Sequence, residues 1–324
     1  MLFFIFSCKK TDVSTAQNIY IAGAQYNGAK AVAKYWVNGT EHSLTDGTRS
    51  AVATSIMVVG NDVYVTTLED FRFMKYWKNG IPTNLTDGSE FGWAYSIYVN
   101  GNDVYVAGSE NTLTGAKAKY WKNGIATDLS NGVRAASAHA IIVVGNDVHV
   151  AGTESLGSSS VIRYWKNGVG TNITDGTKNI FANALAVNGS DVYIGGTERD
   201  ATKSLAKVWK NGIAKTLSDG TKDAFVYGVA VSGGVVHVVG YEVGSGSYTV
   251  AKYWKNGVET NLSDGTTNCI ANSIAVYGND VFIAGYEHDG LGNEIAKCWK
   301  NGLPTNTGIS GSFSSSAKSV YVTK

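Results

Sequence analysis

The sequence is poor in cysteine and in charged residues, and it has no long apolar run. Three cysteines in 324 residues cannot build a disulfide scaffold. No stretch approaches the roughly 18 consecutive apolar residues of a membrane-spanning helix. Lys and Arg total 27 and Asp and Glu total 26, so the net charge of +1 creates no field that would attract nucleic acid, an anionic membrane or a polyanionic substrate. Binding through bulk charge is therefore excluded.

The composition nevertheless predicts an ordered protein. Charged residues make up 16% of the chain, below the roughly 25% of ordinary soluble domains. Hydrophobic residues make up 44% and aromatic residues 11%, enough for a large core. C-x-x-C, H-E-x-x-H and paired-His spacings are missing, so we expect neither a metal nor a cofactor.

A repeated motif, YWKNG or a close variant, organises the chain. Its tryptophans are Trp36, Trp77, Trp121, Trp165, Trp209, Trp254 and Trp299, at intervals of 41, 44, 44, 44, 45 and 45 residues. Each repeat contains four short strand-like segments bounded by Gly, Asn or Asp, as in Ser96 to Val99, Asp103 to Gly108, the KYW segment, and the segment ending at Gly132. The Asn-Gly after each KYW segment predicts a tight hairpin. Seven such units predict an all-β, seven-bladed β-propeller with four-stranded antiparallel blades.

The two chain ends complete each other. The segment Asn18 to Gly23 matches a second strand without a first, whereas Ser319 to Val322 matches a first strand without a second. We predict that these segments pair, complete the seventh blade and close the ring.

The first hairpin supplies a predicted register. If Asn27-Gly28 forms a two-residue loop, Ile19 faces Trp36. The same register places an Asp directly opposite a Lys in five units, namely Asp62 with Lys78, Asp103 with Lys122, Asp147 with Lys166, Asp191 with Lys210 and Asp280 with Lys300. A second recurrence, a Glu after the second strand and a Lys or Arg two residues before Trp, predicts a diagonal or inter-blade ion pair.

The repeated side chains are interpreted as structural. We expect the tryptophans to pack between blades, and His149, His237, Cys269 and Cys298 to be buried. The Ser/Thr-Asp-Gly corner favours an Asx-turn over a calcium site, because one carboxylate per corner falls far short of the oxygens that Ca²⁺ needs.

Function is expected where the repeats differ. Both tight turns of each unit fall on one face of the disc, so the variable loops lie on the opposite face. Just before the first strand of each blade, at the expected mouth of the central channel, lies a residue that differs from blade to blade. These candidate ligand-binding residues are Thr54, Tyr95, His139, Asn183, Tyr227, Asn272 and Lys318. The alternative is that they are solvated strand ends.

The N-terminus resembles the end of a bacterial lipoprotein signal. An apolar run ends at Ile5-Phe6-Ser7 before Cys8, followed by Lys9 and Lys10. The resemblance implies residues 1–8 as a partial signal with Cys8 as the lipid anchor, 9–17 as a tether, and 18–324 as a single propeller domain. The alternative is an apolar N-terminal tail.

The chain as a whole resembles seven-bladed propeller repeat proteins among bacterial envelope lipoproteins, which implies a location in the cell envelope, periplasmic or surface-exposed. The first hypothesis is a lipid-anchored, monomeric binding scaffold whose channel mouth takes a glycan, peptide or protein, with the membrane contacted only through the anchor. The second is a glycan hydrolase or lyase at the same mouth, with His139 and Glu90 as the first candidate catalytic residues. No pair of titratable groups is evident from spacing, so no catalytic residue is assigned.

Overall fold

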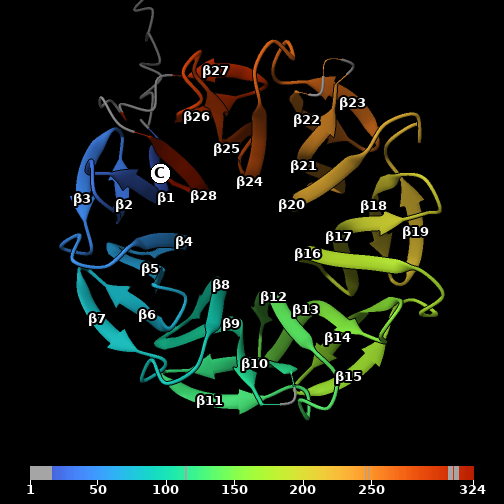
Figure 1. Cartoon of the computed structure of the whole chain (residues 1–324), viewed down its shortest axis with the longest axis horizontal. Coiled ribbons are helices and arrows are strands. Elements are labelled where there is room, and N and C mark those ends of the chain that lie inside the picture. Colours follow the sequence, from blue (N-terminus) through green and yellow to red (C-terminus); the bar gives the residue numbers. More distant parts are fainter. Residues whose placement is uncertain (1–16, 114, 245, 247, 306–308, 310–313) are drawn as a thin grey trace, which may run out of the picture.

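A computed structural model shows a closed ring of seven four-stranded antiparallel sheets around a central channel (Figure 1). It describes residues 17–113, 115–244, 246, 248–305, 309 and 314–324. Cys8 and the predicted signal and most of the tether lie outside these residues. Across the described ranges there are no helices, and accordingly no helix long and apolar enough to cross a membrane. The predicted all-β, seven-bladed architecture is confirmed.

Each blade has an inner strand at the channel, two middle strands and a short outer strand. The inner strands are β28 (Ser315–Thr323), β4 (Ala51–Val59), β8 (Gly92–Asn100), β12 (Ala136–Val144), β16 (Asn179–Asn188), β20 (Ala224–Ser232) and β24 (Cys269–Tyr277). The second strands are β1 (Asn18–Tyr26), β5 (Asp62–Glu69), β9 (Asp103–Thr112), β13 (Asp147–Ser155), β17 (Asp191–Arg199), β21 (Val235–Val243) and β25 (Asp280–His288).

The third strands carry the KYW motif: β2 (Ala31–Val37), β6 (Phe73–Lys78), β10 (Gly115–Lys122), β14 (Ser160–Lys166), β18 (Ser204–Lys210), β22 (Thr249–Lys255) and β26 (Glu294–Lys300). The outer strands are β3 (Thr40–Ser43), β7 (Ile81–Asn84), β11 (Ile125–Asp128), β15 (Val169–Asn172), β19 (Ile213–Thr216), β23 (Val258–Asn261) and β27 (Leu303–Thr305). The outer strands start directly after Asn-Gly, earlier than the Leu-Ser/Thr-Asp-Gly segments suggested.

The ring closes through the chain ends, as predicted. Strand β28 pairs antiparallel with β1, from Asn18 opposite Thr323 to Gln25 opposite Ser315. Buried Val320 and Val322 of β28 join one apolar cluster with Trp36 of β2 and Phe282 of β25. The closing blade therefore packs against its neighbour in the same way as a blade made from continuous chain.

The predicted register of the first hairpin is wrong by two residues. Trp36 lies opposite Ile21, not Ile19. The loop between β1 and β2 has four residues, because the Asn27 side chain accepts hydrogen bonds from the backbone N–H groups of Ala29 and Lys30 and closes a wider turn.

The predicted ion pairs form, but diagonally rather than directly across the strands. Lys78 lies opposite Tyr64, and its Nζ reaches back 2.8 Å to Asp62. The same contact recurs at 2.7–2.9 Å in the four other Asp–Lys units. The second recurrence is also diagonal, as Lys75 with Glu69 at 2.7 Å illustrates. Its ion-pair counterparts are Glu110–Lys119, Glu154–Arg163, Glu198–Lys207, Glu242–Lys252 and Glu287–Lys297. Both sets fix neighbouring strands and are structural.

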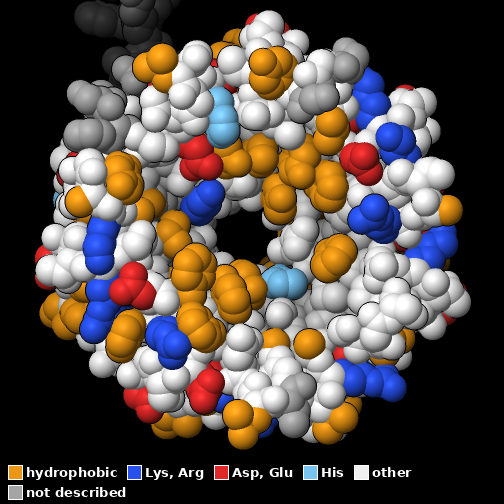
Figure 2. All heavy atoms as spheres, viewed as in Figure 1, with side chains coloured by type: hydrophobic (Ala, Val, Ile, Leu, Met, Phe, Trp, Pro, Cys, Tyr) orange, Lys and Arg blue, Asp and Glu red, His pale blue; other side chains and the backbone are white. Residues whose placement is uncertain are grey.

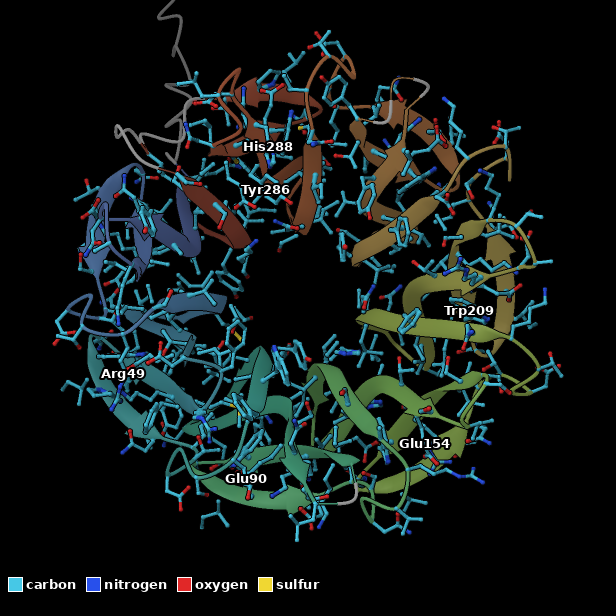
Figure 3. The ribbon with its side chains drawn as sticks, viewed as in Figure 1. Arg49, Glu90, Glu154, Trp209, Tyr286 and His288 are labelled. Carbon is cyan, nitrogen blue, oxygen red and sulfur yellow. The ribbon has the colours of Figure 1, made fainter. Side chains whose placement is uncertain are left out.

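The repeated tryptophans pack between blades, which confirms their predicted role. Trp165 is fully buried in a cluster with Leu129 and Tyr105 of the preceding blade, and its indole N–H donates to the Leu129 carbonyl at 2.9 Å. Trp209, labelled in Figure 3, is 2% exposed and packs with Ile162 of its preceding blade. Each indole thus fills the wedge-shaped gap between two radial sheets.

The turns define two unlike faces. In the Asn-Gly turns both residues have positive φ, for example 49° at Asn38 and 86° at Gly39, as type I′ turns require. We name the side carrying these turns the tight-turn face and the opposite side the variable-loop face. The predicted Asx-turns also form: the Asp87 carboxylate accepts from the backbone N–H and hydroxyl of Ser89.

The predicted buried histidines and cysteines are buried. His149 and His237 are 6% and 5% exposed, and each Nδ1 contacts a tyrosine hydroxyl. Burial lowers the pKa of both imidazoles and raises the pKa of the Cys269 and Cys298 thiols to about 12. Desolvation of the charged form explains all four directions.

Candidate functional site

All seven candidate residues lie around one end of the central channel. Together with Val52 they line a hollow of about 330 Å³, which we call the channel mouth. Figure 2 shows the open hole at the centre of the disc, with hydrophobic, Lys/Arg and His side chains around its rim. The structure brings all seven together, as the sequence analysis expected, and their role in ligand binding stays a prediction.

Their position within the blades differs from the prediction. The candidates do not precede the inner strands but lie inside them, each as the extra residue of a β-bulge. In β8, for example, Ala94 pairs with Gly108 and Ser96 with Ala107, which leaves Tyr95 without a cross-strand partner. The same shift occurs in all seven inner strands. A bulge re-aims the extra side chain, so each blade presents one residue at the mouth.

A glycine of the second strand makes room for the bulge. A Cβ on Gly108 would lie 2.1 Å from the Trp93 carbonyl oxygen. Five other blades have glycine at this place, and Thr67 replaces it in the blade of β4, where its hydroxyl accepts from the Trp77 indole at 2.8 Å. The Gly that ends six of the seven DVYVAG-like segments was thus the sequence signal of the bulge, and sequence reasoning missed it.

Three mouth residues also link adjacent blades. His139 Nδ1 lies 2.5 Å from the Ala182 carbonyl oxygen, and the Nδ2 groups of Asn183 and Asn272 each donate at 2.8 Å to a carbonyl of the next inner strand. Because a carbonyl oxygen only accepts, Nδ1 of His139 carries the hydrogen. These contacts hold the rim rigid, which favours a preformed binding surface.

The environment of His139 keeps it neutral. Burial lowers its pKa, and the hydrogen bond to Ala182 opposes this effect only in part. The Tyr95 ring packs edge-on against the imidazole, with centroids 4.6 Å apart. Burial raises the pKa of Tyr95, and Ser109 and Ser137 oppose this effect only in part. The pair therefore forms an uncharged, partly aromatic wall.

Two tyrosines behind the rim were not predicted. Tyr241 lies beside Tyr227, with ring centroids 5.8 Å apart, and the Lys318 ammonium lies 5.1 Å from the Tyr286 ring centroid. Burial raises the pKa of both Tyr241 and Tyr286 and lowers that of Lys318. Both tyrosines follow the bulge-opposing glycine, where the other blades have smaller residues, and this irregularity was the available sequence signal.

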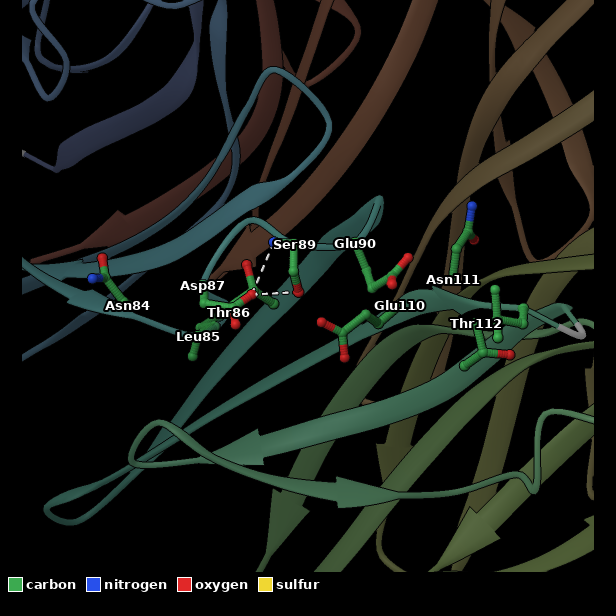
Figure 4. A pocket seen from close by; sticks show the side chains of 10 residues that line it. Asn84, Leu85, Thr86, Asp87, Ser89, Glu90, Glu110, Asn111 and Thr112 are labelled. Carbon is green, nitrogen blue, oxygen red and sulfur yellow. Dashed lines mark hydrogen bonds between the residues drawn. The ribbon is translucent and has the colours of Figure 1, made fainter.

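A larger hollow, of about 820 Å³, lies elsewhere, between the β7–β8 connection and the end of β9 (Figure 4). It contains Glu90, which Figure 3 shows near the outer rim of the disc and away from the channel. Its other carboxylates are engaged: Asp87 closes an Asx-turn, and Glu110 pairs with Lys119 at 2.6 Å. The two candidates of the enzyme hypothesis, Glu90 and His139, are not brought together, because they line separate hollows.

The described residues offer no group of three His, Cys, Asp or Glu side chains that could hold a metal ion. Across the described lining of the channel mouth, no Asp or Glu is present. The arrangement provides aromatic faces, amides, hydroxyls and one ammonium group. Such a set is suited to holding a ligand.

The comparisons with known proteins agree on the fold. No family model and no curated protein matches the sequence. A solved puromycin hydrolase superposes over 90% of this chain with a TM-score of 0.61 at 9% identity. A Mycobacterium tuberculosis puromycin-hydrolyzing peptidase gives 0.58 at 9% identity over 89% of the chain, and TolB from Acinetobacter baumannii gives 0.50 at 11% identity over 76%.

These similarities define the class of protein, a seven-bladed β-propeller. The chain covers 52% and 53% of the two hydrolases and 64% of TolB. Identities this low carry the fold and not the activity. The particular function must therefore be argued from the channel mouth.

Proposed function

We propose that this chain is a binding scaffold whose channel mouth takes up part of a glycan, peptide or protein. One observation carries the proposal: the seven residues that break the repeat converge on a single hollow. Its volume of about 330 Å³ is at the lower end of the range for small-molecule sites, roughly 300–1,000 Å³. That space suits one sugar unit or one amino-acid side chain.

Binding is favoured over catalysis by the surroundings of His139. Glycoside hydrolysis typically uses two Asp or Glu carboxyl groups. The described residues that line the mouth with His139 include neither. The hydrolase neighbours share only the propeller fold with this chain, so they add no argument for a glycan hydrolase or lyase.

The proposed setting is the bacterial cell envelope, with the chain attached as a monomer through lipid on Cys8. The Ile5-Phe6-Ser7-Cys8 segment supports this proposal. Metabolic labelling with a radioactive fatty acid tests it: the wild-type chain should take up label and Cys8→Ala should not. Equal labelling of both would contradict the anchor.

The binding role is tested with the full chain on a printed array of glycans and peptides. The variant Tyr95→Ala/His139→Asn/Tyr227→Ala should abolish binding of whatever probe the wild type retains. Asn at position 139 preserves the blade contact, because Asn183 and Asn272 already make it. The control is Ile125→Ala, at a residue 76% exposed on the outer strand β11. Unchanged binding by the triple variant, with an unchanged melting curve, would reject the mouth as the site.

A further inference from the structure

Lys318 is the lysine among the seven residues at the mouth, and its ammonium has no hydrogen-bond or ion-pair partner among the described residues. Lysines of the repeated motif, such as Lys119 with Glu110 at 2.6 Å, form ion pairs within their blades. Lys318 Nζ makes no hydrogen bond or ion pair with any described residue and lies 5.1 Å from the centroid of the Tyr286 ring. A partly buried ammonium with this environment is poorly compensated.

The acidic group that acts on the Lys318 ammonium is too distant to form an ion pair with it. Glu294 is the acidic group whose charge acts on Lys318, and it raises the pKa of the amine against the larger lowering effect of burial. A carboxylate bound in the mouth would supply the charge-assisted hydrogen bond that the ammonium lacks.

A second hollow continues from the mouth at His139. It has a volume of about 290 Å³ and runs between the blades of β12 and β16 on the variable-loop face. Its polar lining includes Ser137, Thr153, Ser155, Ser159 and Asn179. None of its described lining residues is charged. We call this hollow the hydroxyl groove.

An exposed aromatic ring completes the hydroxyl groove. Phe181, 51% exposed, lines the groove within β16. Hydroxyl and amide side chains next to a flat aromatic face match the alternating O–H groups and C–H faces of a sugar. A peptide would place charged and bulky side chains into the same space, for which the groove has no partner.

We infer that the mouth and the hydroxyl groove together bind an acidic oligosaccharide, with the carboxylate of one uronic acid unit at Lys318 and the next sugar unit in the groove. This inference rests on the proposed binding function. The volume of the mouth fits a single hexuronate. His139 lines both hollows and so lies where the oligosaccharide would pass from the mouth to the groove.

The test uses the full chain and three sets of probes. These are di- and trisaccharides ending in glucuronic, galacturonic or mannuronic acid, the same oligosaccharides as methyl esters, and tripeptides with a free C-terminal carboxylate. We expect a uronate probe to bind and its methyl ester to bind at least ten-fold more weakly. Binding confined to tripeptides, equal binding of acid and ester, or no uronate binding would each overturn the inference.

Single substitutions locate the carboxylate and the sugar. Lys318→Met should weaken uronate binding at least ten-fold without changing the affinity for the methyl ester, and Lys318→Arg should restore much of it. Phe181→Ser should weaken trisaccharides more than a monosaccharide uronate. The matched control Lys122→Met removes a lysine from the tight-turn face and should leave the affinity for the uronate unchanged. Melting curves confirm that each variant is folded.

The outcomes separate the inference from the proposed function. If the Tyr95/His139/Tyr227 variant abolishes uronate binding while Lys318→Met leaves it intact, the mouth is the site and the carboxylate assignment is wrong. If tripeptides bind and the triple variant abolishes that binding, the scaffold function holds and the saccharide inference fails. If neither variant affects a bound probe, both proposals fail.

Discussion

The closure of the ring can be tested by adding a single methyl group at Gly23. This residue lies in β1 opposite Ala317 of β28, at the bulge formed by Lys318. A Cβ at this position would lie 1.8 Å from the Ser316 carbonyl oxygen. The obstacle is backbone, so no side-chain rotation relieves it, and Gly23→Ala must push β28 away from β1 by more than an ångström.

The cost follows from the contacts that this shift breaks. Overpacking in a well-packed region costs about 1–3 kcal/mol, and each backbone hydrogen bond lost adds about 1 kcal/mol. The pairs from Gly23–Ala317 to Gln25–Ser315 are all affected. We therefore expect Gly23→Ala to lower the free energy of unfolding by about 2–5 kcal/mol, measured by urea denaturation, and to accelerate hydrogen exchange of β28.

A matched variant separates ring closure from general strain. Gly108→Ala places a Cβ 2.1 Å from the Trp93 carbonyl oxygen, in a blade made from continuous chain. It should cost a similar free energy, yet leave exchange of β28 slow. If Gly23→Ala leaves both the urea midpoint and the exchange of β28 unchanged, the chain ends do not close the ring in the way described.

Two further predictions concern packing and pH. Trp165→Ala should lower the free energy of unfolding by about 3–5 kcal/mol, because Trp165 is fully buried between two blades; a loss below about 1 kcal/mol in urea denaturation would contradict inter-blade packing as its role. The folded-state pKa values of His149 and His237 lie below the ordinary value of 6.5, so protonation favours the unfolded chain. The stability that the two neutral imidazoles contribute is therefore complete above about pH 6.5 and is lost as the pH falls below it. The variant His149→Tyr/His237→Tyr, which introduces the residue found at Tyr64 and Tyr105, should therefore reduce the drop in urea midpoint between pH 7 and pH 5, and an unchanged drop would refute this assignment.

The sequence was sufficient for the architecture because each blade repeats the same local signals. Asn-Gly at every third-to-outer turn and a buried Trp in every blade were enough to define strands and blade count. The strand register was harder to predict from the sequence. It depended on the loop from Asn27 to Lys30, whose side-chain hydrogen bonds make a four-residue turn from a sequence that also reads as a two-residue one.

The composition of the mouth was predictable, but its surroundings were not. Position in the repeat identified Tyr95 and Lys318 without any coordinates. The Tyr286 face beside Lys318 and the hydroxyl groove beside His139 are formed by segments that only the packing of neighbouring blades brings together. Linear spacing gives no measure of such distances, which is also why the separation of Glu90 from His139 could not be predicted from the sequence.

The bulge explains why the fold repeats while the mouth does not. Inner-strand residues on either side of the bulge are paired across the sheet and packed against the next blade, so their size and polarity are constrained. The bulged residue has no cross-strand partner, as Tyr95 shows between Ala94 and Ser96. A side chain freed from pairing and aimed into the channel can change without loss of the sheet. The bulge in each inner strand thus provides seven positions at which the side chain can vary without loss of strand pairing, and Lys318 is the one at which that variation has placed a charge.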